Sequence, residues 1–186
     1  MKRILFGLSY AFTLITYSGA YCQNIDVNNK VLMINNDLGV FPSASGVSLS
    51  GKKYSIPADL PSDRTLVLIS FEPEHADVLQ TWSTGLDLPN SQIPWIVTPV
   101  LPSPLVLGRF FIDRKMRSDI PDPKLQERVI TLYIDRESFA KSMGFEFNKS
   151  DPYIAVIDRN GKKLGMVKGY YDEAKAKEIL GLLGMK

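Results

Sequence analysis

The first clear pattern of apolar and polar positions along the chain is that of a β-hairpin. Residues 47–56 (VSLSGKKYSI) alternate apolar and polar side chains on both sides of a Gly51-Lys52 turn, and Pro57 ends the pattern. This alternation predicts two antiparallel strands. Residues 65–71 (TLVLISF) then form an apolar run bounded by turn residues. Such a run indicates a strand that is covered on both faces.

Helical and extended patterns alternate through the rest of the chain. In residues 74–83, Ala76, Leu79 and Trp82 share one helix face, and acidic residues lie near the N-terminus, where the helix dipole favours them. The later segments are predicted as strand 93–100, helix 104–117, strand 129–134, helix 137–143, strands 153–157 and 163–168 around an Asn160-Gly161 turn, and helix 172–183. This order of hairpin, βαβ, βα and ββα predicts an α/β fold with a mixed sheet.

The composition is that of an ordinary globular protein. The chain has 186 residues, of which 45% are hydrophobic and 23% are charged, so one domain with a substantial core is expected. Lys2 and Arg3 belong to an N-terminal segment that is expected to be cleaved. Without them, the chain has 20 basic residues and 20 acidic ones. A formally neutral protein has no nucleic-acid footprint, and we predict no nucleic-acid partner.

The N-terminus resembles a secretory signal peptide. Lys2 and Arg3 precede an apolar stretch, residues 4–17, and the small residues Ser18, Gly19 and Ala20 follow. The apolar stretch is short for a membrane span. We expect residues 1–22 to be a signal peptide and residues 23–46 a polar lead segment, which predicts a periplasmic or secreted protein.

Two alternatives to simple cleavage concern the same stretch. Cleavage fits after Ala20 and also after Cys22, so the mature N-terminus is expected between Tyr21 and Asn24. Attachment of a lipid to Cys22 is disfavoured by the bulky Tyr21 before it, and an uncleaved anchor is disfavoured by the short apolar stretch.

Cys22 is the only cysteine of the chain, and His75 is the only histidine. One cysteine excludes an internal disulfide, a CxxC redox pair and a thiolate metal cluster. The sequence also has no glycine-rich phosphate loop and no metal-loop spacing of carboxylates. We therefore predict no cofactor and no metal.

Two stretches resemble redoxin-type proteins of the thioredoxin fold. Residues 48–57 with the strand that follows resemble the opening of that fold, and residues 151–162 (DPYIAVIDRNGK) resemble its final proline, hairpin and helix. The resemblance covers residues 47–183. It implies a thioredoxin-like mixed β-sheet flanked by helices, with an N-terminal β-hairpin, in a domain of residues 47–186 with a helical insertion at about 101–124. It also implies a cis peptide bond before Pro152.

The redox cysteines of that family would fall at Ala76 and Leu79. Neither residue can form a thiolate, which thiol–disulfide exchange and peroxide reduction require. We therefore expect a redox-inactive thioredoxin-like protein. Residues 71–82 and 109–117 are also distantly similar to the mitochondrial ATP synthase assembly factors of the Atp-ten type, which lack a CxxC motif and act as assembly chaperones. This second resemblance favours a binding or assembly role over an enzymatic one.

His75 lies in the polar turn that follows the buried strand. It is a candidate general base, with Ser70 and the acids Glu72, Glu74 and Asp77 near it in sequence. As a metal ligand, His75 would need two or three further ligands, and the chain has no second histidine. We favour a third interpretation, in which His75 is a solvated or locally capped residue in the first turn of the helix.

Two surfaces are candidates for a partner. We expect a protein partner to contact a binding face that corresponds to the family's active site. A second candidate is a basic patch on helix 104–117, which could dock an anionic partner or lipid headgroups, although Asp113 and Asp119 interrupt it and favour a solvated helix face. The alternative function is a hydrolase that uses His75 and nearby carboxylates. The binding face consists of Glu72, Glu74, His75, Asp77, Asp151 and Pro152, and the basic patch of Arg109, Arg114, Lys115 and Arg117.

Overall fold

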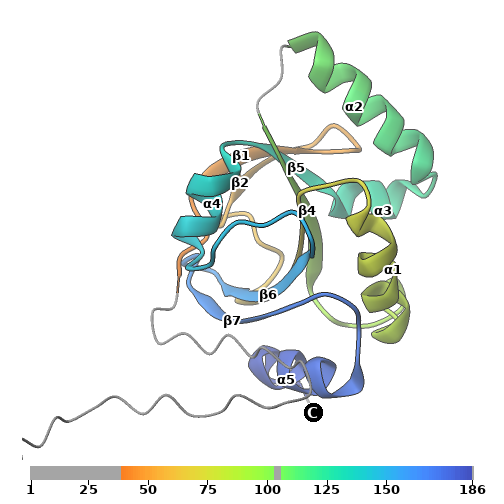
Figure 1. The fold of residues 1–186 in the computed structure, drawn as a ribbon. Helices are drawn as coiled ribbons and strands as arrows, with labels where there is room; N and C mark the ends of the chain where they lie inside the picture. Colours follow the sequence, from red (N-terminus) through yellow and green to blue (C-terminus); the bar gives the residue numbers. More distant parts are fainter. Residues whose placement is uncertain (1–38, 103–105, 186) are drawn as a thin grey trace, which may run out of the picture. The chain divides into compact units, whose positions relative to one another are not determined.

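The computed structural model describes residues 39–102 and 106–185, so the expected signal peptide and most of the lead segment lie outside the described residues. All described residues belong to one compact unit. Its elements, shown in Figure 1, are β1 (Ala44–Ser48), β2 (Lys53–Ile56), β3 (Arg64–Ser70), α1 (His75–Gly85), β4 (Trp95–Leu101), α2 (Val106–Asp119), α3 (Pro123–Arg128), β5 (Ile130–Tyr133), α4 (Arg136–Ser142), β6 (Tyr153–Asp158), β7 (Lys163–Lys168) and α5 (Glu173–Leu183).

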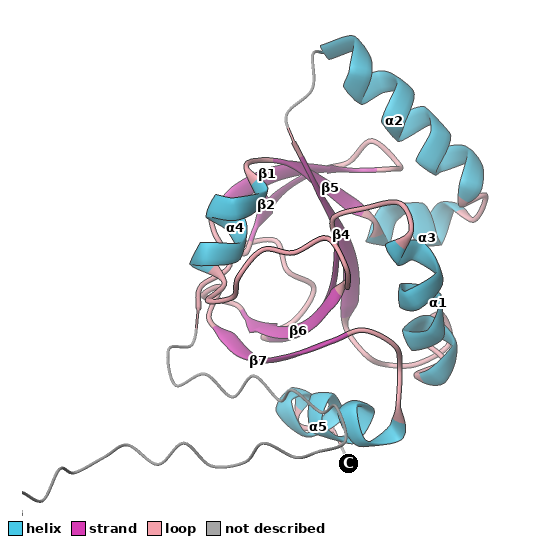
Figure 2. Cartoon of the chain, in the orientation of Figure 1, coloured by secondary structure: helices cyan, strands magenta, loops and turns pink. Residues whose placement is uncertain are grey.

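The strands form one mixed sheet of seven strands in the order β2-β1-β5-β4-β3-β6-β7. Strands β3, β4 and β5 are parallel, whereas β6 pairs antiparallel with β3 and β7 pairs antiparallel with β6. The hairpin of β1 and β2 extends the other side of the sheet, because β1 pairs antiparallel with β5. Figure 2 shows helices on both faces of this sheet. The predicted α/β fold with a mixed sheet is confirmed.

The core has two layers, one on each face of the sheet. In β3, Val67 and Ile69 belong to the layer that α4 covers with Phe139, whereas Leu66 and Leu68 belong to the layer that α1 and α5 cover. All four β3 side chains are at most 1% exposed. Successive strand residues point to opposite faces, and this is why a strand between two layers is apolar at every position.

Helix α3 was not predicted. The pattern predicts no helix between residues 117 and 129, but the structure begins a short helix within the segment Ile120-Pro121-Asp122-Pro123. The Asp122 side chain accepts a hydrogen bond from the Lys124 backbone N–H at 2.8 Å, and Pro123 is the first helical residue. Aspartate is a favourable N-cap, and proline fits the first turn, where its missing N–H is not needed. The residues that follow the end of α2 at Asp119 therefore begin α3 at Pro123.

Helix α2 is attached to the rest of the domain through polar side chains. The Tyr133 hydroxyl donates to Asp113 at 2.8 Å, and Arg117 Nε donates to the Leu49 carbonyl at 2.7 Å. These contacts give a phenol and a backbone carbonyl hydrogen-bond partners. Ile112 on the same helix is 36% exposed.

The prediction of a cis bond before Pro152 is wrong. The only cis peptide bond within residues 39–102 and 106–185 is the one between Ile56 and Pro57. Trans is the lower-energy form of a bond before proline by about 0.5–1 kcal/mol. In the trans arrangement the Pro152 carbonyl accepts a hydrogen bond from the Gly169 N–H at 3.1 Å, which continues the pairing of β6 and β7 by one residue.

Candidate functional site

The predicted binding face lies beyond the carboxyl ends of β3 and β4. The turn of residues 71–74 leaves β3 there and leads into α1, and residues 144–152 approach the same end before entering β6. Ligands of α/β proteins bind most often outside the carboxyl ends of parallel strands. The side chains at this end are therefore the first to examine.

His75 is buried, with 2% of its surface exposed. Its Nδ1 accepts a hydrogen bond from the Phe71 backbone N–H at 3.2 Å, and its Nε2 lies 3.0 Å from the Lys149 carbonyl oxygen. Because Nδ1 is an acceptor, Nε2 carries the proton and donates it to Lys149. Both ring nitrogens are thus occupied by backbone groups. We predicted a solvated or locally capped His75. The ring is buried and not solvated, and it bonds both to the nearby Phe71 N–H and to the distant Lys149 carbonyl, so it ties the turn after β3 to the loop before β6.

Arg136 holds the same turn from the other side. This residue is the first of α4, and its side chain is 16% exposed. Its guanidinium donates to the carbonyl of Phe71, to the carbonyl of Val100 at 3.2 Å, and to Glu72 Oε1 at 2.9 Å. Arginine can serve several acceptors at once because its donors are arranged in a rigid planar fork. Arg136 therefore connects the ends of β3 and β4.

Glu72 receives two cations. Arg136 Nη1 lies 2.9 Å from its Oε1, and Lys149 Nζ lies 3.8 Å from the same oxygen. Lys149 is 70% exposed, so its contribution is small, whereas the Arg136 pair is mostly covered. The carboxylate of Glu72 is committed to this network and is not available as a base.

Aromatic side chains pack next to the hydrogen bonds of His75 and Arg136. Phe71 makes edge contacts with Phe145, Phe147 and Tyr153, with ring centroids 5.1–6.2 Å apart. The Tyr153 hydroxyl accepts from Asn148 at 2.9 Å, and burial raises the pKa of Tyr153 above its usual value. This packing holds residues 145–153 against the end of β3, so the Lys149 carbonyl stays in place for His75.

The predicted binding face is only partly at the surface. Glu74 and Asp77 are exposed, and so is Ala76, where the resemblance predicts the first cysteine. Asp151 is half-buried and its carboxylate lies 3.6 Å from Lys168 Nζ, while Pro152 is buried. Leu79, where the resemblance predicts the second cysteine, is 7% exposed and belongs to the core. The accessible rim of this face, called here the α1 rim, consists of Glu74, Ala76, Asp77 and Lys149.

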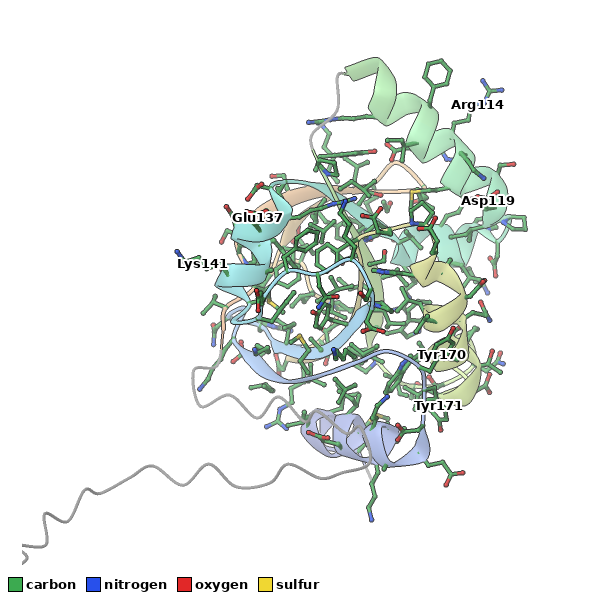
Figure 3. All side chains as sticks on the ribbon, viewed as in Figure 1. Arg114, Asp119, Glu137, Lys141, Tyr170 and Tyr171 are labelled. Carbon is green, nitrogen blue, oxygen red and sulfur yellow. The ribbon has the colours of Figure 1, made fainter. Side chains whose placement is uncertain are left out.

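The four residues of the basic patch do not form one surface. Arg117 binds the Leu49 carbonyl, and the Arg109 guanidinium lies 4.7 Å from the centroid of the Tyr133 ring. Arg114 and Lys115 are exposed, and Lys115 pairs with Asp119 at 3.1 Å, beside the outward-pointing Arg114 that Figure 3 labels. Two of the predicted contact residues thus attach α2 to the sheet.

Sequence reasoning missed Arg136 and Lys149. A signal for Arg136 existed, because it directly follows a strand that runs parallel to β3 and β4, so its side chain starts at the same edge of the sheet. Lys149 had no such signal, since it acts on His75 through a backbone carbonyl that any residue could supply.

The described residues contain no group of three or more His, Cys, Asp or Glu side chains that could hold a metal ion. None of the helices within residues 39–102 and 106–185 has the length and apolar character needed to cross a bilayer.

The chain is similar in structure to proteins of the thioredoxin class. A protein from Aquifex aeolicus VF5 assigned to electron transport has a TM-score of 0.56 and 10% identity, and covers 78% of this chain and 96% of its own. BsSco, a member of the Sco family of cytochrome c oxidase assembly proteins, has a TM-score of 0.55 and 14% identity, and the match covers 81% of this chain and 95% of BsSco. The exposed lipoprotein thioredoxin of Streptococcus pneumoniae strain TIGR4 has a TM-score of 0.50 and 15% identity, and the match covers 77% of this chain and 100% of the lipoprotein.

No protein-family model matches the chain, and the search of curated proteins found no match. At identities of 10–15%, the similar structures establish the fold alone. The expected thioredoxin-like fold is confirmed on this basis. The resemblance to ATP synthase assembly factors remains a hypothesis.

Proposed function

We propose that this chain is a redox-inactive, exported thioredoxin-like protein that binds a protein partner through the α1 rim. The observation that carries the proposal is the hydrogen-bond network of His75 and Arg136, which holds the turn after β3 in one conformation. A rim on a rigid turn loses little conformational entropy when a partner binds.

The absence of redox activity follows from the positions where the thiolates would stand. Ala76 is exposed and Leu79 is part of the core, and the chain's one cysteine is Cys22, far away in sequence. Disulfide exchange begins with attack by a thiolate, and neither alanine nor leucine can supply one.

The hydrolase alternative has no geometric support. A general base needs a free nitrogen within hydrogen-bond reach of the proton that it removes, and both nitrogens of His75 bind backbone groups. Glu72, one of the acids of the turn, is paired with Arg136. His75 and Glu72 therefore hold the turn in place, and Glu74 and Asp77 are exposed.

The α1 rim suggests the chemistry of the partner. Its exposed carboxylates, Glu74 and Asp77, flank the methyl group of Ala76, and they belong to the first turn of α1 or precede it directly. These charges favour a partner segment with basic residues around a small apolar contact. One structural neighbour belongs to a family of cytochrome c oxidase assembly proteins, so a role in assembly is compatible with this fold.

Export rests on the sequence of residues 1–22, which lie outside the described part of the chain. Sequencing the N-terminus of protein recovered from the cell envelope tests it. A start between Tyr21 and Asn24 is expected, and an intact Met1 in a cytoplasmic fraction would contradict export.

Site-specific photo-crosslinking tests the binding function. A crosslinking amino acid at Ala76 should capture a discrete partner in the native cells, and the charge reversals Glu74→Lys and Asp77→Lys should reduce the captured amount at least severalfold. The matched control places the same amino acid at Lys141, which is exposed on α4. Capture that is equal at both positions, or that is insensitive to both reversals, would refute a specific rim.

An insulin-reduction assay with the purified protein tests redox inactivity separately. We expect no turnover above the reductant alone, and the Cys22→Ser variant should behave identically. Measurable reduction by the wild-type protein would overturn this part of the proposal while leaving the binding experiment valid.

A further inference from the structure

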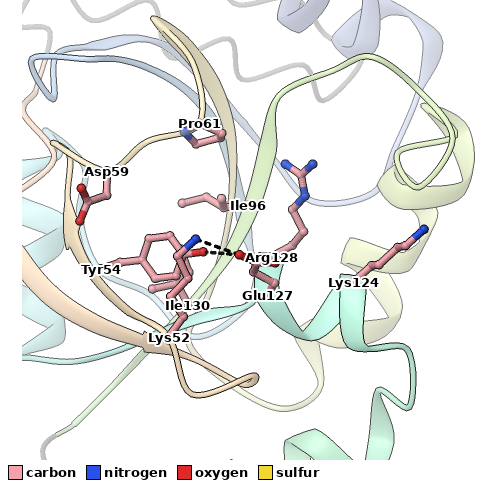
Figure 4. Close-up of a pocket in the computed structure, with 9 residues that line it drawn as sticks. All are labelled: Lys52, Tyr54, Asp59, Pro61, Ile96, Lys124, Glu127, Arg128 and Ile130. Carbon is pink, nitrogen blue, oxygen red and sulfur yellow. Dashed lines mark hydrogen bonds and ion pairs between the residues drawn. The ribbon is translucent and has the colours of Figure 1, made fainter.

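A hollow of about 420 Å³ lies at the opposite end of the parallel strands from the α1 rim. Its floor is formed by Ile96 and Ile130, which are 3% and 1% exposed and stand at the beginnings of β4 and β5. Its walls come from β2, from the segment that leads into β3, and from α3, as Figure 4 shows. This hollow, called here the hairpin pocket, is lined by Lys52, Tyr54, Ile96, Glu127, Arg128 and Ile130, with Asp59, Pro61 and Lys124 at its edges.

One wall of the hairpin pocket is already neutralised within the protein. Lys52 Nζ lies 2.9 Å from Glu127 Oε1, and the Tyr54 hydroxyl donates to the same oxygen at 3.3 Å. These contacts hold the pKa of Glu127 below its usual value and that of Lys52 above it. Glu127 is therefore a carboxylate whose charge is compensated chiefly by Lys52, and its attraction to Arg128 is a weaker contribution.

The other wall carries two cations that are not neutralised. Arg128 donates from Nη1 to the Trp95 carbonyl at 3.1 Å, and its guanidinium lies 5.5 Å from the centroid of the Trp95 ring. Trp95 thus orients Arg128 while using one of its five donors. The ammonium of Lys124 has no ion pair or hydrogen bond with any residue in the described ranges. Arg128 therefore borders the apolar floor, whereas Lys124 lies at the outer edge of the pocket in Figure 4 and its flexible side chain would turn inward to reach a ligand.

The remaining acid of the pocket does not cancel these charges. Asp59 accepts a hydrogen bond from the Ser55 N–H at 2.7 Å, and Figure 4 draws it across Ile96 from Arg128. A ligand with one acidic group would therefore turn that group toward Arg128 and Lys124. Arginine that is held in a fixed orientation binds carboxylate or phosphate in a bidentate manner. The volume of the hairpin pocket falls in the range of about 300–1,000 Å³ that is typical of small-molecule sites, and most of its lining residues, around the isoleucine floor, are polar.

We propose that the hairpin pocket binds a small organic anion, whose carboxylate or phosphate contacts Arg128 and Lys124 and whose apolar body covers the isoleucine floor. This site shares no residue with the α1 rim. The two proposals can therefore be tested independently. Its ligand is defined by an acidic head and an apolar body of a few carbon atoms.

The two tryptophans of the chain provide a direct assay. Trp95 contacts Arg128, and its indole N–H donates to the Leu88 carbonyl at 3.0 Å, whereas the Trp82 indole donates to Gly169 and packs edge-on against Tyr171. In a ¹⁵N-labelled protein, each indole N–H gives its own NMR signal. Ligand in the hairpin pocket should shift the Trp95 signal and leave the Trp82 signal in place, so Trp82 is an internal control.

The probes are hexanoate, hexyl phosphate and hexylammonium, titrated at constant ionic strength, with acetate to test the contribution of the apolar body. We expect saturable shifts of the Trp95 signal with both anions, and the tighter of the two identifies the preferred acidic group. Hexylammonium should cause no saturable shift, and acetate should bind at least severalfold more weakly than hexanoate, because it covers little of the floor.

Variants at the two cations test the assignment. Arg128→Gln should weaken binding of the anions at least tenfold, and Lys124→Gln should weaken it severalfold. The control Lys141→Gln removes an exposed cation from α4 and should leave the affinity unchanged. Lys124→Gln keeps the test valid if Arg128→Gln disturbs folding, because the Lys124 ammonium contacts no described residue. Equal binding of hexanoate and hexylammonium, or unchanged affinity in Lys124→Gln and Arg128→Gln, would overturn the proposal.

Discussion

The two ends of the parallel strands use their charged residues in opposite ways. At the carboxyl ends of β3 and β4, Arg136 is bonded to Glu72 and to two backbone carbonyls, and both ring nitrogens of His75 are bonded to backbone groups. At the beginnings of β4 and β5, Arg128 retains most of its donors and Lys124 has no described partner. The first end looks reactive in the sequence and is structural, whereas the second has space and unused donors around an apolar floor.

This difference suggests a way to choose between two candidate sites of one fold. Residue types alone pointed to the first end, because it holds the one histidine and several acids. A group whose hydrogen bonds are all made within the protein stabilises the protein, while a group with unused donors next to a cavity can recognise a ligand. Measurements of stability should therefore distinguish the two ends.

The largest effect is expected from Arg136→Met. This change removes three charge-assisted contacts to Phe71, Val100 and Glu72, and it leaves mostly covered acceptors without partners. We expect the free energy of unfolding to fall by about 2–4 kcal/mol, as measured by urea denaturation. The control Arg159→Met breaks an exposed pair with Asp63 at 2.9 Å and should cost less than about 1 kcal/mol. Similar losses in the two variants would mean that the Arg136 network is not a structural clamp.

A somewhat smaller effect is expected from His75→Ala. The substitution leaves the Phe71 N–H and the Lys149 carbonyl unpaired and opens a small void, so the free energy of unfolding should fall by about 2–3 kcal/mol. Gln80→Ala on the same helix removes only an exposed hydrogen bond to Thr84 and should change stability by less than about 0.5 kcal/mol. If His75→Ala were as mild as Gln80→Ala, the buried ring would not be the tie that its contacts indicate.

The smallest effect is expected at the hairpin pocket, and it depends on pH. The pKa of Glu127 is lowered mainly by its hydrogen bond to Lys52, so its contribution to stability is present above the unfolded pKa and is lost as the pH falls through the folded one. The thermal midpoints of the wild type and Glu127→Gln should therefore differ slightly at about pH 7, and the difference should shrink as the pH falls below the folded pKa of Glu127.

Asp135→Asn is the matched control for that measurement. The pKa of Asp135 is also lowered, chiefly by its hydrogen bond to Ser138 at the start of α4, but it makes no contact with the hairpin pocket. When both proteins also carry Asp135→Asn, the difference in thermal midpoint caused by Glu127→Gln should depend on pH in the same way as before. A difference between wild type and Glu127→Gln that grew toward acidic pH would contradict the sign derived for this carboxylate.

Much of the fold could be predicted because its signals are local. The alternation around Gly51 predicted the hairpin of β1 and β2, and the Asn160-Gly161 turn predicted that of β6 and β7, which the structure contains. The apolar run of β3 predicted burial on both faces, and two core layers cover it. The position of the polar turn after β3 was likewise correct to within a few residues.

The roles of the polar residues were decided by partners far away in the chain. His75 bonds to a carbonyl 74 residues later, and Arg136 reaches back 64 residues to Glu72. Helix α2 shows the same dependence, since Asp113 and Arg117 bind the Tyr133 hydroxyl and the Leu49 carbonyl, which lie 20 and 68 residues away in the chain. The sequence by itself determined where strands, helices and turns form, because those depend on neighbours along the chain. Tertiary structure alone decided which polar groups are satisfied and which remain available, because hydrogen bonds are short-ranged and their partners meet only after the sheet is assembled.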